Sequence, residues 1–166
     1  GMDIGEGLIS DNIDRLMGIL TIEGFTKTAE NLIYQNTKEK SALWFYNIKK
    51  FKFVNDFYGY EMGDKLISYW GRLLLETTGE GETCGRMSGA TVVFLTKYTT
   101  DEDIKAQFRM MSDKVGTFFE RHGFKHFVEL CAGVYKLTPE DMHRPDLNQM
   151  LDWVALAEQN AHAKSG

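Results

Sequence analysis

The chain has 166 residues, of which 43% are hydrophobic and 13% aromatic, and its formal net charge is −5 at pH 7. This composition supplies a full core for one compact domain and argues against a disordered chain. The acidic balance lacks the basic field that holds a phosphate backbone, so it argues against a nucleic-acid partner. No apolar run approaches the roughly 18 residues that a membrane span requires, so none is predicted.

The cysteine content is low and scattered. Cys84 and Cys131 lie far apart and form no metal-type cluster. They are more typical of reduced thiols in the cytoplasm than of a disulfide framework. We therefore expect a cytoplasmic protein with a single domain over residues 14–166, preceded by a Gly- and Asp-rich lead-in at 1–13.

The first half of the chain predicts helix, strand and helix. From Thr21, apolar residues recur at the spacing of one helix face. Residues 41–48 form a continuous apolar and aromatic run, which is typical of a buried central strand. After a short loop, the spacing from Met62 to Leu74 predicts a long amphipathic helix, which Gly79 and Gly81 end.

The second half predicts a hairpin, two helices and a further strand. Residues 83–87 and 91–96 flank Ser88-Gly89, a pair suited to a tight turn. A helix is expected over 104–118, a strand over 127–135, a loop around Pro139 and Pro145, and a last helix over 147–163. Strands that alternate with helices in this order predict an α+β domain around a mixed or antiparallel sheet.

A strand end beside a hairpin tip is a common place for a metal–nucleotide site. Two-metal phosphoryl transfer needs hard oxygen ligands, normally Asp or Glu, on such neighbouring strand ends. Here the strand end offers Asn47, and the tip offers Ser88, Gly89, Ala90 and Thr91. A missing general base alone costs about 10²–10⁴-fold in rate. The chemistry therefore predicts no tight Mg²⁺ pair and no catalysis.

Two polar residues nearby suit a purine base. The amide of Asn55 can pair with a purine edge, and the carboxylate of Asp64 could accept hydrogen bonds from the N1–H and N2–H₂ groups of guanine. The alternative is structural: Asn55-Asp56 is also an ordinary loop and helix-cap sequence, and Asp64 could be a solvated helix residue. The residues alone leave both interpretations open.

Two segments together resemble the GGDEF domain, the module that makes cyclic di-GMP from two GTP molecules. Residues 47–64 are similar to the family pattern D-I-D-x-F-K-x-I-N-D-x-x-G-H-x-x-G-D, and residues 86–92 stand where R-Y-G-G-D/E-E-F is expected. Residues 14–20 and 130–134 are similar to the family's opening and late motifs. The resemblance implies a central, mostly antiparallel sheet of about five strands flanked by helices, with a nucleotide-cyclase-like, ferredoxin-like core.

The resemblance also implies which functions remain. Asn55 and Asp64 occupy the guanine-recognition positions, and Lys50, Phe51 and Lys52 lie where the family contacts phosphates. Asn47 replaces a metal-binding Asp. The degenerate signature offers no catalytic residue, because Ala90 and Thr91 replace its two acids and Ser88 replaces a glycine; its members are Ser88, Gly89, Ala90, Thr91 and Val92. The family's R-x-x-D product site is replaced by residues 79–82, and Lys164 is the nearest candidate for a triphosphate contact.

Three hypotheses follow. The favoured one is a catalytically inactive domain of bacterial cyclic di-GMP signalling, which binds GTP or another guanine nucleotide or contacts other signalling domains. It needs no cofactor, and Mg²⁺ enters only with residual GTP binding or activity. The second is an active diguanylate cyclase that draws a metal ligand from Asp56 or Glu61. The third is an interaction domain whose nucleotide cleft is filled by Tyr46 or Met87. The resemblance also implies a homodimer as a candidate assembly.

Overall fold

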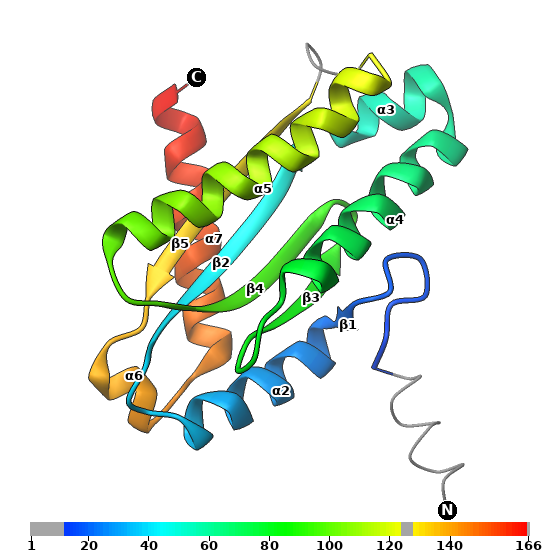
Figure 1. The fold of residues 1–166 in the computed structure, drawn as a ribbon. Coiled ribbons are helices and arrows are strands. Elements are labelled where there is room, and N and C mark those ends of the chain that lie inside the picture. Colours follow the sequence, from blue (N-terminus) through cyan, green and yellow to red (C-terminus); the bar gives the residue numbers. More distant parts are fainter. Residues whose placement is uncertain (1–11, 124–127, 166) are drawn as a thin grey trace, which may run out of the picture.

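The computed structural model describes residues 12–123 and 128–165. Five strands form one sheet in the order β1-β3-β4-β2-β5 (Figure 1). β2 pairs antiparallel with both β4 and β5, β3 pairs antiparallel with β4, and only the short β1 runs parallel to its neighbour β3. The strands are β1 Leu20–Thr21, β2 Lys40–Lys49, β3 Thr83–Ser88, β4 Thr91–Tyr98 and β5 Glu129–Lys136. The predicted α+β class and mostly antiparallel sheet are confirmed.

Helices cover both faces of this sheet. α4 (Tyr60–Thr77) and α5 (Asp101–Arg121) cross one face, whereas α2 (Ile22–Gln35) and α7 (Leu147–Ser165) cover the other, together with the short α6 (Pro139–His143) (Figure 1). Along β2, Trp44 and Tyr46 point to the first face and Leu43 and Phe45 to the second. Because both faces are covered, the centre of the strand, residues 42–46, is continuously apolar and aromatic.

The core beneath α4 contains an aromatic stack. The ring of Trp44 lies parallel to that of Tyr46 with centroids 5.3 Å apart, and Trp70 of α4 meets Tyr46 edge-on at 6.5 Å. Tyr46 is fully buried there. It is therefore part of the core, which leaves it unavailable to fill a nucleotide cleft.

Two predicted loops are helical, and this corrects the sequence analysis. The region after β2 forms α3 (Phe51–Tyr58), and the loop around Pro139 contains α6. The N-cap residue of α3 is Lys50, which has a left-handed φ of 64° and makes no side-chain capping bond, so no capping signal marks the start of the helix. α6 has Pro139 in its first turn and a capping box between Thr138 and Asp141.

The hairpin turn is also displaced. β3 extends to Ser88, a register shift falls between Arg86 and Ser88, and the turn lies at Gly89-Ala90. Gly89 has a φ of 48°, a conformation that favours glycine.

No helix in the described part of the chain is long and apolar enough to cross a membrane.

Candidate nucleotide site

The end of β2 and the tip of the β3–β4 hairpin lie together. Asn47 faces Thr91 of β4 on one side and Cys131 of β5 on the other. The backbone N–H of Ile48 donates to the carbonyl of Ala90 at 3.0 Å, which fixes the tip against the strand end. The strand end and the hairpin tip, where two-metal chemistry would need its ligands, are thus neighbours.

These positions hold no charge. The hydroxyl of Thr91 donates to Oδ1 of Asn47 at 3.2 Å, and Ala90 is buried beside them. Within residues 12–123 and 128–165, no group of three or more His, Cys, Asp or Glu side chains could hold a metal ion. Mg²⁺ needs near-octahedral oxygen ligands, with carboxylates to offset its dehydration. One amide oxygen that already accepts a hydrogen bond does not fit such an ion.

The remaining signature residues have structural positions. Val92 is fully buried in the core, and Ser88 is exposed at the end of β3. Arg86 donates from Nε to the carbonyl of Gly89 at 3.0 Å, which closes the hairpin tip.

An ion pair joins the hairpin to the opening loop. Arg86 Nη1 lies 3.1 Å and 3.2 Å from the two carboxylate oxygens of Asp14, and Asp14 Oδ1 also accepts from the backbone N–H of Met17 at 2.8 Å. Both side chains are largely buried. The sequence analysis quoted both motifs but missed this pair. The sequence held one signal for this pair: the opening motif contains the acid Asp14, and the signature segment contains the base Arg86.

The two residues predicted to recognise guanine, Asn55 and Asp64, lie on either side of the joint between α3 and α4. Gly59 connects the two helices with a φ of 91°. Gly63 lies against the side chain of Asn55, since a Cβ at residue 63 would lie 2.0 Å from Oδ1 of Asn55. The missing side chain at Gly63 therefore makes room for the Asn55 amide, and Asp64 follows Gly63 in the chain.

Both polar groups of this pair are uncommitted. Asp64 is exposed and Asn55 is half-buried. Among the interactions of the described residues, neither side chain makes a hydrogen bond or ion pair. Without such partners, the carboxylate and the amide can present two acceptors and a donor to a ligand.

The lysines sit at the start of α3. Lys50 and Lys52 are exposed, and Lys49 at the end of β2 is half-buried. Lys52 Nζ lies 5.7 Å from the ring of Phe53. Phe51 packs against the core, with its ring edge 3.3 Å from the Cβ position at Gly63. Phe51 therefore holds α3 against α4, while the lysines remain open to an anion.

Other candidates lie elsewhere. Asp56 on α3 and Glu61 on α4 are exposed helix residues, whereas Asn47 lies on the strand β2. The side chain of Lys164 lies outside the described part of the chain.

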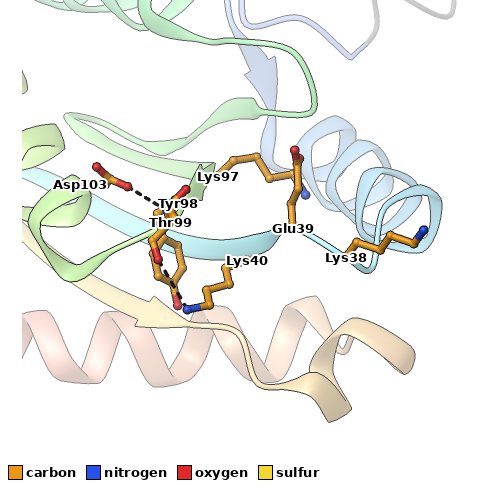
Figure 2. A pocket seen from close by; sticks show the side chains of 7 residues that line it. All are labelled: Lys38, Glu39, Lys40, Lys97, Tyr98, Thr99 and Asp103. Atoms are coloured by element: carbon orange, nitrogen blue, oxygen red, sulfur yellow. Dashed lines mark hydrogen bonds between the residues drawn. The ribbon is translucent and has the colours of Figure 1, made fainter.

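A lysine-rich pocket of about 420 Å³ opens at the opposite end of β2, near Lys40 (Figure 2). Beside it, the carboxylate of Glu82 accepts from the backbone N–H groups of Gly79 and Lys97, each at 2.8 Å. This is the stretch that stands where the product site was expected. Its acid is already bonded to backbone, and Gly79 contributes no side chain.

The fold is an α+β domain in which helices cover both faces of a mostly antiparallel, five-stranded sheet. The sequence matches the family described as "Diguanylate cyclase, GGDEF domain" over residues 11–164, and the chain belongs to this family. A curated diguanylate cyclase of Vibrio cholerae serotype O1 is 25% identical over 109 residues, which cover 64% of this chain and 33% of that protein. The chain thus spans about a third of the length of that relative.

Solved structures share the fold. The coiled coil and GGDEF domain of DgcB from Caulobacter crescentus, in complex with c-di-GMP, has a TM-score of 0.77 at 12% identity, covering 98% of this chain and 86% of that one. The diguanylate cyclase SiaD of Pseudomonas aeruginosa, in complex with its activator SiaC, has a TM-score of 0.76 at 21% identity, covering 98% of this chain and 64% of that one. At these identities the likeness concerns the fold alone.

Proposed function

We propose that this GGDEF domain is a non-catalytic regulatory module of cyclic di-GMP signalling, which binds a guanine nucleotide without requiring Mg²⁺. The observation that carries the proposal is the hydrogen bond between Thr91 and Asn47. It joins two neutral side chains at the positions where the chemistry needs carboxylates. A pair of metal ions has no charged ligand there, so the in-line transfer that two metals promote lacks its clamp.

Base recognition is supported by Asp64 and Asn55. Guanine presents two adjacent donors, N1–H and N2–H₂, which a single carboxylate can accept together. Adenine has an acceptor at N1, which would face the carboxylate of Asp64 with no proton between them. A site that leaves such a polar group unpaired rejects the wrong base. GTP is therefore the preferred ligand over ATP.

Phosphate binding without a metal is supported by the lysines. Lys49 stands at the second Asp of the D-I-D pattern, and Lys50 and Lys52 follow at the start of α3. Ammonium groups can neutralise phosphate oxygens in place of Mg²⁺. Because these side chains are largely exposed, their contribution falls as salt rises.

Titration calorimetry with the purified chain tests the proposal. GTP is titrated with Mg²⁺ and then with EDTA, and ATP is titrated under both conditions. We expect GTP to bind equally well with and without Mg²⁺, and ATP to give no saturable heat at the same concentrations. Equal binding of GTP and ATP would overturn the assignment of Asp64 and Asn55 as base readers.

A parallel incubation with GTP and Mg²⁺ tests catalysis. The nucleotides are separated by chromatography after a long incubation at high protein concentration. We expect no cyclic di-GMP. Magnesium-dependent product would contradict the non-catalytic assignment and favour an atypical active cyclase.

A second candidate function is protein interaction without a nucleotide. The complex of SiaD with its activator SiaC favours it, because a neighbour of the same fold has a protein partner. Absence of heat with every nucleotide at millimolar concentration would select this candidate.

A further inference from the structure

One edge of the sheet is formed by β5. The order β1-β3-β4-β2-β5 leaves this eight-residue strand with a strand neighbour on one side only in the described part of the chain. The N–H of Leu137 donates to the carbonyl of Ser41 at 3.0 Å, so odd-numbered residues of β5 bond to β2. The N–H and C=O groups of Ala132 and Val134 therefore point away from the sheet, along an edge that can pair with another strand.

On the face toward α5, this edge is bordered by an apolar floor and two cations. A groove of about 350 Å³ runs between α5 and β5, and its floor includes Trp44, Phe108 and Val134. Lys105 and Arg109, one helical turn apart, also line it and are exposed. Among the described residues Arg109 has no ion-pair partner, and Lys105 has one exposed pair with Glu102 at 3.4 Å. Exposed pairs of this kind are readily exchanged.

On the opposite face, the same edge is bordered by exposed apolar side chains of α7. Trp153 is 46% exposed and Leu156 is 55% exposed, three residues apart on one side of the helix. The ring of Trp153 lies 5.6 Å from that of Tyr135 of β5. α7 comes close to the strand because Gly133 has no side chain; a Cβ there would lie 2.6 Å from the carbonyl oxygen of Val154.

We propose that β5 is a docking edge for an extended acidic segment of a partner protein, which adds a sixth strand antiparallel to β5. Its carboxylates lie on the face toward Lys105 and Arg109, and its apolar side chains lie against Tyr135, Trp153 and Leu156. Cations separated by one helical turn are about 6 Å apart along the helix. This matches the roughly 6.6 Å between residues i and i+2 of a strand. The two Glu residues of a Glu-x-Glu sequence can therefore face Lys105 and Arg109 together. Backbone bonds supply affinity and the side chains supply specificity.

A second copy of this chain is the less favourable occupant. Pairing two β5 edges around a twofold axis places both α5 helices on the same side of the joined sheet. Lys105 and Arg109 of one copy then approach the same cations of the other, and like charges oppose that contact. An acidic partner replaces this repulsion with attraction.

The test uses the intact chain and a fluorescein-labelled, end-capped peptide, Val-Glu-Val-Glu-Val-Glu-Val, followed by fluorescence anisotropy. We expect saturable binding that Arg109→Glu weakens by about tenfold or more. A peptide with Lys in place of Glu binds the wild type poorly and binds the double variant Lys105→Glu/Arg109→Glu better. Lys114→Glu is the matched control, since it reverses an exposed charge of α5 outside this groove and leaves binding unchanged.

N-methylated peptides separate strand pairing from simple charge attraction. In antiparallel pairing, the N–H groups of the Glu residues face β5, so methylating them abolishes binding, whereas methylating the Val residues leaves it nearly unchanged. Equal loss with both peptides, or equal binding of a scrambled peptide of the same composition, would overturn the proposal. Sedimentation of the chain alone tests whether a second copy occupies this edge. A concentration-dependent dimer that Val134→Asp dissociates would assign the edge to a second copy. The outcomes of the peptide-binding and sedimentation experiments do not depend on whether the chain binds a nucleotide.

Discussion

Two polar regions of this domain differ in whether their side chains already have hydrogen-bond partners. At the end of β2, Asn47 and Thr91 bond to each other and present no charge. Across the joint between α3 and α4, Asn55 lies against Gly63, which precedes Asp64 in the chain, and the side chains of Asn55 and Asp64 make no hydrogen bond or ion pair among the described residues. The side chains of the first, closed region bond to each other, whereas those of the second, open region make no hydrogen bond among the described residues. Under the proposed function, recognition is kept and catalysis is lost within one fold.

Removing the carboxylate of the open region should give the largest change. We expect Asp64→Ala to weaken GTP binding by about 30-fold or more, because deleting one partner of a charged hydrogen-bonded pair costs about 2–5 kcal/mol. Asn47→Ala, in the closed region, should leave the affinity within about twofold. Calorimetry measures both. Asp56→Ala is the matched control, since it removes an exposed carboxylate of α3 that the site does not use. A loss of affinity with Asn47→Ala as large as with Asp64→Ala would erase the contrast between the regions.

Gly63→Ala should disturb the open region without unfolding it. The new Cβ would collide with Oδ1 of Asn55, which is the end of a side chain that can rotate away. We expect GTP affinity to fall about tenfold, corresponding to one hydrogen bond to the base of about 1–1.5 kcal/mol.

The control for Gly63→Ala is a glycine with free space around it. A Cβ at Gly116 of α5 meets nothing within 4 Å, so Gly116→Ala should raise the free energy of unfolding by about 0.5–1 kcal/mol and leave GTP affinity unchanged. Urea unfolding measures stability for both variants. Normal GTP affinity in Gly63→Ala would show that the Asn55 amide plays no part in binding.

The sequence predicted the buried layers better than the short connections. β2 was evident because both of its faces are covered and its central residues, 42–46, are all apolar or aromatic. α3 was missed because it has only eight residues and starts at a left-handed Lys50 without a cap, so neither periodicity nor a start signal marked it. The turn at Gly89-Ala90 was placed one residue early because the bulge between Arg86 and Ser88 shifts the register.

Within the candidate site, the residues could be predicted but their bonds could not. Asn47, Asn55 and Asp64 were all named from spacing. The bond between Thr91 and Asn47 depends on the strand register, and the pair of Asp14 with Arg86 joins residues 72 positions apart. Spacing alone does not fix which side chains meet over such separations.

Restoring carboxylates to the closed region should make its stability depend on metal. In Asn47→Asp/Thr91→Glu two anions face each other on paired strands, and we expect the melting temperature to fall by about 3–8 °C, from roughly 1–2 kcal/mol of repulsion. Millimolar Mg²⁺ should recover most of this loss by bridging the pair. Thermal melts with Mg²⁺ and with EDTA measure it. Asn47→Gln/Thr91→Gln is the uncharged control, and an equal Mg²⁺ response in the control or the wild type would contradict a charge effect.

The smallest expected effect concerns the bond that closes the first region. Thr91→Val leaves Oδ1 of Asn47 without its donor, and we expect a loss of about 1 kcal/mol in the free energy of unfolding. Asn47→Ala/Thr91→Val removes both partners, so its cost should be smaller than the sum of the single costs. Urea unfolding of the wild type, both single variants and the double variant gives this coupling. GTP affinity should be the same in all four proteins, because the bond contributes only to the stability of the strand end. Additive costs would show that the two side chains do not interact, and that the neutral strand end is held by the backbone bond from Ile48 to Ala90 instead.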